Sequence, residues 1–329
     1  MNSNNLNSKH KNLVKLKFIF FSTFLFLLYL FSNTFIYAQY DEKSDSKYLI
    51  PVGSVIQIDA ELKNLLVRNT TENSPFNIGD MIISINNKNI NNYGEFSNYL
   101  SSLSDNNVDV LICRSSTNIT IHTNKDELEK INFNNLLSGF ATLTYIDPEV
   151  NEFGAVAHPI SVGNTRKIPI KSGTISSTSN LNFQRSIKGS VGCINGQRLS
   201  SIGEFTYNSD FGIKGNITNF NTQKLKKYEV ASLDEVKLGK AQVLLKTDSN
   251  EPKKYDIEII NICNQKSPQP KTIKFRVTDK ELLTKTGGVV QGMSGTPIIQ
   301  NNKIIGAVSH AIENDPSFGY GVFIKWMMK

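Results

Sequence analysis

The sequence predicts a mainly β protein, and two observations carry this prediction. From Ser138 onward, short apolar runs alternate with turns rich in Gly, Asn and Ser, a spacing typical of β-sandwiches and barrels. Helical patterns are rare in this part of the chain, and the convincing case is Thr278-Asp-Lys-Glu281, a capping box followed by Leu-Leu. The expected strands of this β-rich domain are 140–146, 153–157, 191–194, 241–245, 257–262, 273–277, 289–290, 298–299, 304–308 and 320–324.

A chain of 329 residues has room for two domains besides a leader. Its formal net charge is +7, but four of its lysines lie before residue 18, which leaves 32 basic and 29 acidic residues in the rest. That charge is too weak and too scattered for nucleic-acid binding. The three cysteines, Cys113, Cys193 and Cys263, are far apart and lack metal-ligand spacing. We therefore predict no disulfide framework and no zinc site.

The N-terminal region carries a membrane signal. Residues 1–17 are polar and basic, and residues 18–38 are almost wholly apolar, which is long enough to cross a bilayer. The lysines before the apolar segment predict a cytoplasmic N-terminus and translocation of the rest. We predict a retained transmembrane anchor. The alternative is a signal peptide cleaved after Ala38, for which Ile36 is large at an Ala-x-Ala-like site; both interpretations place the functional part outside the cytoplasm.

Residues 49–124 are predicted to form a small α+β domain, with helical spacing over 93–103. The segment Phe76-Asn-Ile-Gly-Asp80, followed by an apolar strand and an Asn-Asn turn, resembles the strand-turn signature of PDZ domains. These domains bind peptides by adding a strand to a sheet edge. The expected peptide-binding residues are Gly53, Ser54 and Val55. The alternative is a domain that only packs against its neighbour.

A glycine-rich loop around Ser294 indicates a nucleophile. Gly292 and Gly295 permit a tight turn that exposes the hydroxyl, and the amides of Gly292 and Ser294 are expected to hold an oxyanion. The order Gly-x-Ser-Gly-x-Pro is that of the nucleophile loop of chymotrypsin-like peptidases, whereas Thr296 departs from the Gly-x-Ser-x-Gly elbow of α/β-hydrolases. The alternative is a simple turn between two strands.

A nucleophilic serine needs a base, usually histidine, and a group that orients the base. His158 and His310 both lie at the ends of expected strands in the β-rich domain. We predict that His158 is the base, because it comes early in the domain and Ser294 late, the order found in chymotrypsin-like double barrels. His310 is the rival base, only 16 residues from the serine, and we expect its strand to line the substrate pocket.

The acid of such a triad stays open at this point. The carboxylates available in the β-rich domain include Asp147, Asp210, Asp234, Asp248 and Asp279. Asp279 also has a simple structural role, because a negative charge in the first turn of a capped helix is favourable with the helix dipole.

Taken together, these stretches resemble the SpoIVB peptidase family of endospore-forming bacteria, membrane-anchored serine peptidases that contain a PDZ domain and have a trypsin-like fold. The resemblance covers nearly the whole chain after residue 48 and is strongest over 277–324. The segments that carry it are 153–160, 211–215, 239–244, 277–297 and 305–324.

The resemblance implies a specific fold and site. It places a trypsin-like double β-barrel over 138–329, after the PDZ-like domain, and assigns the catalytic serine to Ser294, the histidine to His158 and the aspartate to Asp279. No metal or organic cofactor is implied. The family cleaves itself and a membrane-bound regulator of an intramembrane metalloprotease, outside the forespore membrane, which triggers late gene expression in the mother cell.

Two other functions remain open from the sequence. One is a non-catalytic, membrane-anchored PDZ adaptor whose β-rich domain only binds, but such a module needs neither the strand-end histidine nor the Gly-Met-Ser-Gly loop. The other is an HtrA-like quality-control protease, which normally carries its PDZ domain after the peptidase domain rather than before it.

Overall fold

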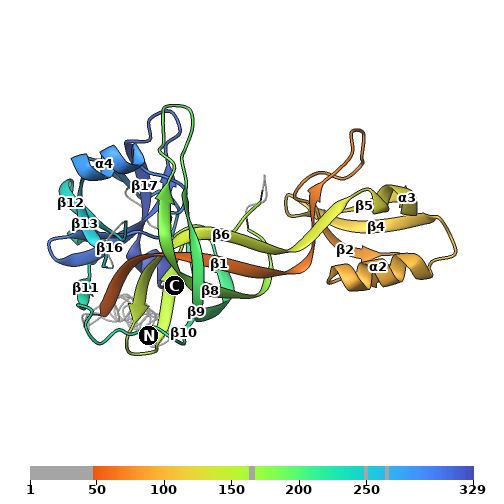
Figure 1. Cartoon of the computed structure of the whole chain (residues 1–329), viewed down its shortest axis with the longest axis horizontal. Coiled ribbons are helices and arrows are strands. Elements are labelled where there is room, and N and C mark those ends of the chain that lie inside the picture. The colour runs from red at the N-terminus through yellow and green to blue at the C-terminus, as the bar shows by residue number, and fades with distance from the viewer. Residues whose placement is uncertain (1–46, 163–166, 248–250, 264–266) are drawn as a thin grey trace, which may run out of the picture. The chain divides into compact units, whose positions relative to one another are not determined.

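The computed structural model describes residues 47–162, 167–247, 251–263 and 267–329, and it is mainly β (Figure 1). Pairing joins the strands into one large mixed sheet. None of the helices in the described ranges is long and apolar enough to cross a membrane. The predicted leader 1–17 and membrane segment 18–38 lie outside these ranges.

Six antiparallel strands close into a first ring. Each strand pairs with two neighbours, and the pairing of β8 with β1 closes the circle, so the ring has no free edge. In order around it, the strands are β1 (Tyr48–Asn69), β6 (Asn132–Asp147), β7 (Glu152–Ala155), β10 (Gly212–Ile217), β9 (Ile194–Ser209) and β8 (Ile170–Phe183).

The C-terminal part of the chain forms a second ring of six antiparallel strands. In order, they are β12 (Gly239–Leu245), β13 (Lys253–Ile262), β14 (Ile273–Val277), β17 (Phe318–Phe323), β16 (Lys303–Ala311) and β15 (Pro297–Gln300). Beside it lie β11 (Tyr228–Val230), the 3-10 turn η1 (Leu233–Glu235), α4 (Lys280–Thr286) and α5 (Ile324–Met327).

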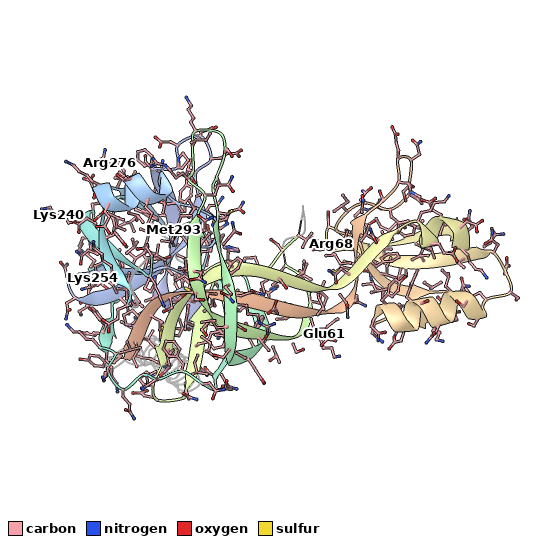
Figure 2. The ribbon with its side chains drawn as sticks, in the orientation of Figure 1. Glu61, Arg68, Lys240, Lys254, Arg276 and Met293 are labelled. Carbon is pink, nitrogen blue, oxygen red and sulfur yellow. The ribbon has the colours of Figure 1, made fainter. Side chains whose placement is uncertain are left out.

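Alternation of apolar and polar residues explains why these segments form ring strands. In β14, Ile273, Phe275 and Val277 are buried, whereas charged side chains such as Lys240, Lys254 and Arg276 project outward from the ring (Figure 2). Full burial of one such apolar side chain contributes about 1.5–3 kcal/mol. Tyr145 and Ala157 of the first ring belong to the same core cluster as the second ring, so the rings pack against each other.

A small α+β domain separates β1 from β6 in the chain. Its helix α2 (Tyr93–Ser102) matches the predicted helix, and the side chain of its N-cap residue Asn92 accepts a hydrogen bond from the amide of Glu95. The domain has its own core, which includes Phe76, Ile82 and Phe96. Its other elements are β2 (Met81–Ile85), β3 (Lys88–Asn89), β4 (Asn107–Arg114), β5 (Thr117–Asn124) and α3 (Lys125–Glu129).

The structure places the boundaries of this domain differently from the predicted 49–124. Residues 50–61 of β1 pair with β6 and β8 in the first ring, and the small-domain core begins at Leu65 and extends to Phe133. The small domain is thus an insertion between the first two ring strands. Gly53, Ser54 and Val55, predicted to bind peptide, therefore lie in the ring, where Val55 is buried and pairs with Thr142.

Candidate active site

The Ser294 loop adopts the tight turn that its glycines predict. Gly292 and Gly295 have φ angles of 98° and 95°, in the region that favours glycine. Thr142 of β6 holds the loop from the first ring, because its amide donates to Ser294 O at 2.9 Å and its hydroxyl donates to Gly292 O at 2.8 Å. The turn is therefore fixed across the junction of the two rings.

Two amides of the loop are free to bind an anion. Within the described residues, no backbone hydrogen bond uses the N–H of Gly292 or of Ser294. The amide of Gly295, by contrast, donates to Val308 O at 2.7 Å. Gly292 and Ser294 both line the same cavity, so their amides are available for the oxyanion role that the sequence predicts.

A turn of unusual conformation carries His158 out of β7. Val156 and Ala157 have φ angles of 78° and 63°, which β-branched and other side chains rarely adopt, and the amide of Ala157 donates to Ala155 O at 3.0 Å. Strain of this kind costs on the order of 1–3 kcal/mol per residue and is characteristic of functional sites. Here the turn ends the strand and brings His158 to the cavity.

The hydrogen bond of His158 settles its protonation pattern. Nδ1 lies 2.9 Å from Pro159 O. Because a carbonyl oxygen only accepts, Nδ1 carries the proton, and Nε2 of the neutral ring carries the lone pair that a base needs. Burial lowers the pKa of His158 below its ordinary value of 6.5, and the bond to Pro159 O opposes this shift. His158 is therefore neutral at physiological pH.

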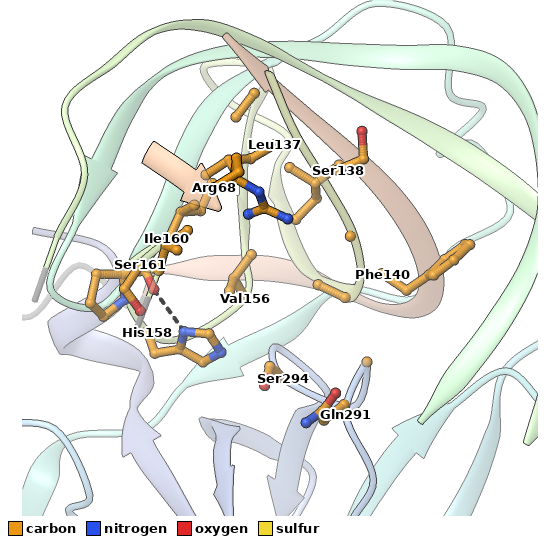
Figure 3. Close-up of a pocket in the computed structure, with 17 residues that line it drawn as sticks. Arg68, Leu137, Ser138, Phe140, Val156, His158, Ile160, Ser161, Gln291 and Ser294 are labelled. Carbon is orange, nitrogen blue, oxygen red and sulfur yellow. Dashed lines mark hydrogen bonds between the residues drawn. The ribbon is translucent and has the colours of Figure 1, made fainter. Parts of the chain in front are cut away.

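His158 and Ser294 face one cavity of about 520 Å³ (Figure 3). The hydroxyl of Ser294 donates to Ser309 O at 3.2 Å rather than to His158, so the serine and the base are not hydrogen-bonded to each other in this structure. Catalytic hydrogen bonds are often long or misaligned before substrate binds. The structure thus brings the predicted nucleophile and base to one site in a resting arrangement.

His310 of β16 lies beside His158, with ring centroids 5.4 Å apart. Its Nδ1 is buried and has no hydrogen-bond partner among the described residues. The pKa of His310 is lowered to about 4, first by burial and then by the charges of His158 and Lys271. Burial lowers the pKa of both histidines, so the pKa does not separate their roles. His158 lines the cavity together with Ser294, whereas His310 is not among the lining residues, and this favours His158 as the base.

The structure does not bring Asp279 to His158. Asp279 is the N-cap of α4, where its carboxylate accepts from the amide of Leu282 at 3.0 Å. The cap thus lies one residue later than the predicted cap at Thr278. The contacts of Asp279 are therefore those of a helix cap, the structural role that the sequence left open.

Asp210 is a candidate acid near the turn that leads to His158. It stands between β9 and β10, and a Cβ on the nearby Gly212 would lie 2.3 Å from Ala155 O and 2.8 Å from Ala157 N. Its carboxylate pairs with Lys167 at 3.2 Å. Asp147, another candidate, pairs with Glu152 at the other end of β7. Asp248, another of the candidate carboxylates, lies outside the described residues.

We expect Asp279→Asn to change kcat/KM by less than about fivefold, because Asn keeps the helix cap while removing the charge. Asp279→Ala should lower the free energy of unfolding by about 1 kcal/mol through loss of the cap. Kinetics and chemical denaturation of both variants, with Asp210→Asn alongside, test this. A loss of about 10⁴-fold in kcat for the Asn variant would instead make Asp279 the triad acid.

Some site residues were not predicted from the sequence. Arg68, Phe140 and Gln291 line the cavity, and Ser309 accepts the serine hydroxyl. Ser309 could have been predicted from the sequence, because it precedes His310 in the strand expected to line the pocket. In the described part of the chain, no group of three or more His, Cys, Asp or Glu side chains is placed to hold a metal ion.

Comparison with known proteins adds a family match. The family model described as SpoIVB peptidase S55 matches residues 131–328. Among solved structures, an inactive form of the Rv3671c protease is 16% identical, with a TM-score of 0.32, over 57% of this chain and 81% of that chain. An inactive serine-to-alanine mutant of Rv3671c from M. tuberculosis H37Rv is 16% identical, with a TM-score of 0.30, over 57% and 78%. Comparison with curated proteins finds no match.

Proposed function

Because this chain belongs to the SpoIVB peptidase S55 family and is a serine peptidase, we propose that it is an endopeptidase that uses Ser294 as nucleophile and His158 as base. The observation that carries the assignment is a single cavity that both residues line, together with the amides of Gly292 and Ser294. An adaptor that only binds has no use for this combination.

The proposed reaction begins when the Ser294 hydroxyl turns from Ser309 O to Nε2 of His158. Nε2 takes the proton as the serine oxygen attacks the peptide carbonyl. Pro159 O keeps accepting from Nδ1 and so holds the ring in the tautomer that can act as base. The imidazolium then protonates the leaving amine, and water resolves the acyl-enzyme by the same steps in reverse.

The amides of Gly292 and Ser294 are proposed to stabilise the tetrahedral oxyanion. Donors of this kind are fixed before the reaction begins, and each contributes about 10²–10³-fold to kcat in well-studied enzymes. Thr142 supports the hole indirectly, because its two hydrogen bonds hold the carbonyls of Gly292 and Ser294 and so orient the loop.

The two closed rings support a trypsin-like double barrel as the finer fold assignment, with the site at their junction. The small domain supports a PDZ-like assignment through its Gly79-Asp80 pair before β2. Asp80 is buried and paired with Arg114 at 2.6 Å, and its carboxylate also accepts from the amide of Asn77. In this structure, the Gly-Asp pair therefore organises the entry to a strand.

We further propose that the enzyme acts in sporulation, as its family membership suggests. A peptidase acts on protein substrates; the proposed ones are the chain itself and a membrane-bound regulator of an intramembrane metalloprotease, whose cleavage activates the late mother-cell sigma factor. An anchor at 18–38 would hold the enzyme outside the cytoplasm and raise its effective concentration near membrane-bound substrates.

In sporulating cells, a Ser294→Ala chain should accumulate uncleaved and fail to trigger late mother-cell gene expression. Ser97→Ala, an exposed serine on α2, serves as the matched control and should behave as wild type. Normal self-cleavage and gene expression in the Ser294→Ala strain would favour the anchored adaptor over the peptidase.

The pH dependence of kcat/KM follows from the lowered pKa of His158. Protonation removes the base, so activity is lost as pH falls, and burial moves that loss below pH 6.5. We expect kcat/KM to be level above that pH and to fall tenfold per pH unit below the folded pKa. Steady-state kinetics from pH 4 to 8 check this, and a midpoint above 6.5 would contradict it.

A further inference from the structure

Arg68 stands out among the 17 described residues that line the active-site cavity. None of these residues is Asp, Glu or Lys, and Arg68 alone among them carries a full charge at neutral pH. Figure 3 shows its guanidinium directed into the space shared with His158 and Ser294. Arg68 is therefore the charged side chain that a ligand would meet in this lining.

Arg68 lies where β1 passes from the first ring to the small domain. Side chains alternate between the two faces of a strand, and in β1 Leu65 and Val67 pack into the small-domain core, whereas Leu66 packs into the core of the first ring. Leu66 pairs with Asn134 and Val67 with Phe133, and the register shifts between Val67 and Asn69, so Arg68 lies at an irregularity of β1. There its side chain lines the cavity together with Ile58 and Ala60 of the same strand.

Arg68 also differs from the other described arginines, because it has no hydrogen-bond or ion-pair partner in the described part of the chain. Arg114 pairs with Asp80 at 2.6 Å and Arg276 with Glu258 at 2.7 Å. Arg198 lies 3.5 Å from Asp59, and the guanidinium of Arg185 donates to Thr284 O.

The acidic residues of the same strand are already engaged. The carboxylate of Asp59 accepts from the side chains of Gln57 and Ser138 and lies beside Arg198. The carboxylate of Glu61 accepts from Lys171 and Ser172. Neither carboxylate forms an ion pair with Arg68. The guanidinium of Arg68, with five N–H donors, is therefore available to a ligand.

We propose that Arg68 forms a carboxylate-binding subsite of the peptidase, which takes an Asp or Glu side chain of the substrate segment beside the scissile bond. This inference rests on the proposed peptidase activity of Ser294. A carboxylate matches the planar fork of a guanidinium, and charge-assisted hydrogen bonds of this type are the stronger ones.

The rest of the cavity indicates what flanks that acidic residue. Ile58, Ala60, Leu137, Phe140, Val156 and Ile160 give it an apolar lining, and about 520 Å³ exceeds the volume of one side chain. The substrate segment is therefore expected to carry apolar side chains next to one acidic side chain. Arg68 is itself exposed, so solvent weakens the pair, and we expect a preference of about tenfold rather than an absolute requirement.

The test is a cleavage-specificity profile of the full-length protein with a library of proteome-derived peptides. Wild type is compared with Arg68→Glu, which reverses the charge, Arg68→Gln, which removes it, and Arg68→Lys, which keeps it without the fork. Lys63→Glu is the matched control, since Lys63 is an exposed residue of the same strand that does not line the cavity. Fluorophosphonate labelling of Ser294 in each variant measures the reactivity of the serine independently of the Arg68 subsite, because the reagent carries no substrate side chain.

Wild type and Lys63→Glu should enrich Asp and Glu at one position near the cleaved bond by about tenfold. Arg68→Gln should lose that enrichment, Arg68→Glu should favour Lys or Arg there, and Arg68→Lys should retain part of it. An acidic preference that survives in Arg68→Glu, or is missing from wild type, overturns the subsite. Absence of labelling in wild type would instead refute the proposed function, so the two failures are distinguishable.

Discussion

Replacing His158 by alanine is expected to lower kcat/KM by about 10⁴- to 10⁶-fold, the range seen when a serine peptidase loses its base. Nε2 of His158 carries a lone pair beside Ser294 and belongs to a ring that Pro159 O holds in the correct tautomer. Without it, the serine hydroxyl keeps its proton and is a poor nucleophile. Steady-state kinetics on folded variants measure the loss.

Two other histidines provide controls for this result. His122→Ala alters an exposed histidine paired with Asp109 in the small domain and should leave kcat/KM unchanged. His310→Ala removes the neighbouring ring, and we expect a smaller loss than for His158→Ala because His310 is not among the residues that line the cavity with Ser294. A larger loss for His310→Ala than for His158→Ala would reverse the two roles.

Gly295→Ala is expected to lower kcat by about 10²- to 10³-fold, comparable to removal of an oxyanion donor. The added Cβ would lie 2.2 Å from Thr142 O and 2.6 Å from Val156 N. Both are backbone atoms and cannot move without shifting the Ser294 loop or the turn before His158. We also expect the free energy of unfolding to fall by about 1–3 kcal/mol from overpacking.

Gly239→Ala separates the effect of the clash from the effect of backbone strain. Gly239 has a φ of 103°, close to that of Gly295, but a Cβ there meets nothing within 4 Å. The variant should lose about 1 kcal/mol of stability and keep full activity. Equal activity losses in the two variants would show that strain, and not displacement of the catalytic loop, is responsible.

The parts of the site that could be predicted from the sequence depend on local chemistry. Ser294 lies between glycines whose positive φ angles are a local property of the loop, and His158 follows an apolar strand that Pro159 stops. The helix α2 was likewise predictable, because its apolar spacing and its Asn92 cap lie within one short segment.

The rest depends on pairings between distant segments, which a single sequence does not display. The two halves of β1 show the same apolar alternation, yet one pairs in the ring and the other packs in the small domain. For this reason a deletion of 49–124, which the predicted boundaries suggest, would remove a strand of the first ring. Arg68 reaches the cavity only because of that long strand, so no local pattern marks it.

Asp279 has a clear local pattern, but that pattern fits two roles: the structural role of a helix cap, and the catalytic role that the family resemblance implies. Its carboxylate caps α4 in this structure, and the helix dipole favours a negative charge there. Conservative replacement by Asn, which keeps the cap, is what separates the two roles, whereas an alanine variant alone would combine them.

Labelling of the full-length protein with a fluorophosphonate, followed by peptide mapping, shows whether Ser294 is an activated nucleophile. We expect modification of Ser294, which is lost in Ser294→Ala and slowed at least about 10²-fold in His158→Ala. Labelling that persists in Ser294→Ala, or its absence from a folded wild-type chain, would mean that Ser294 is not the nucleophile and that the rings form a binding module.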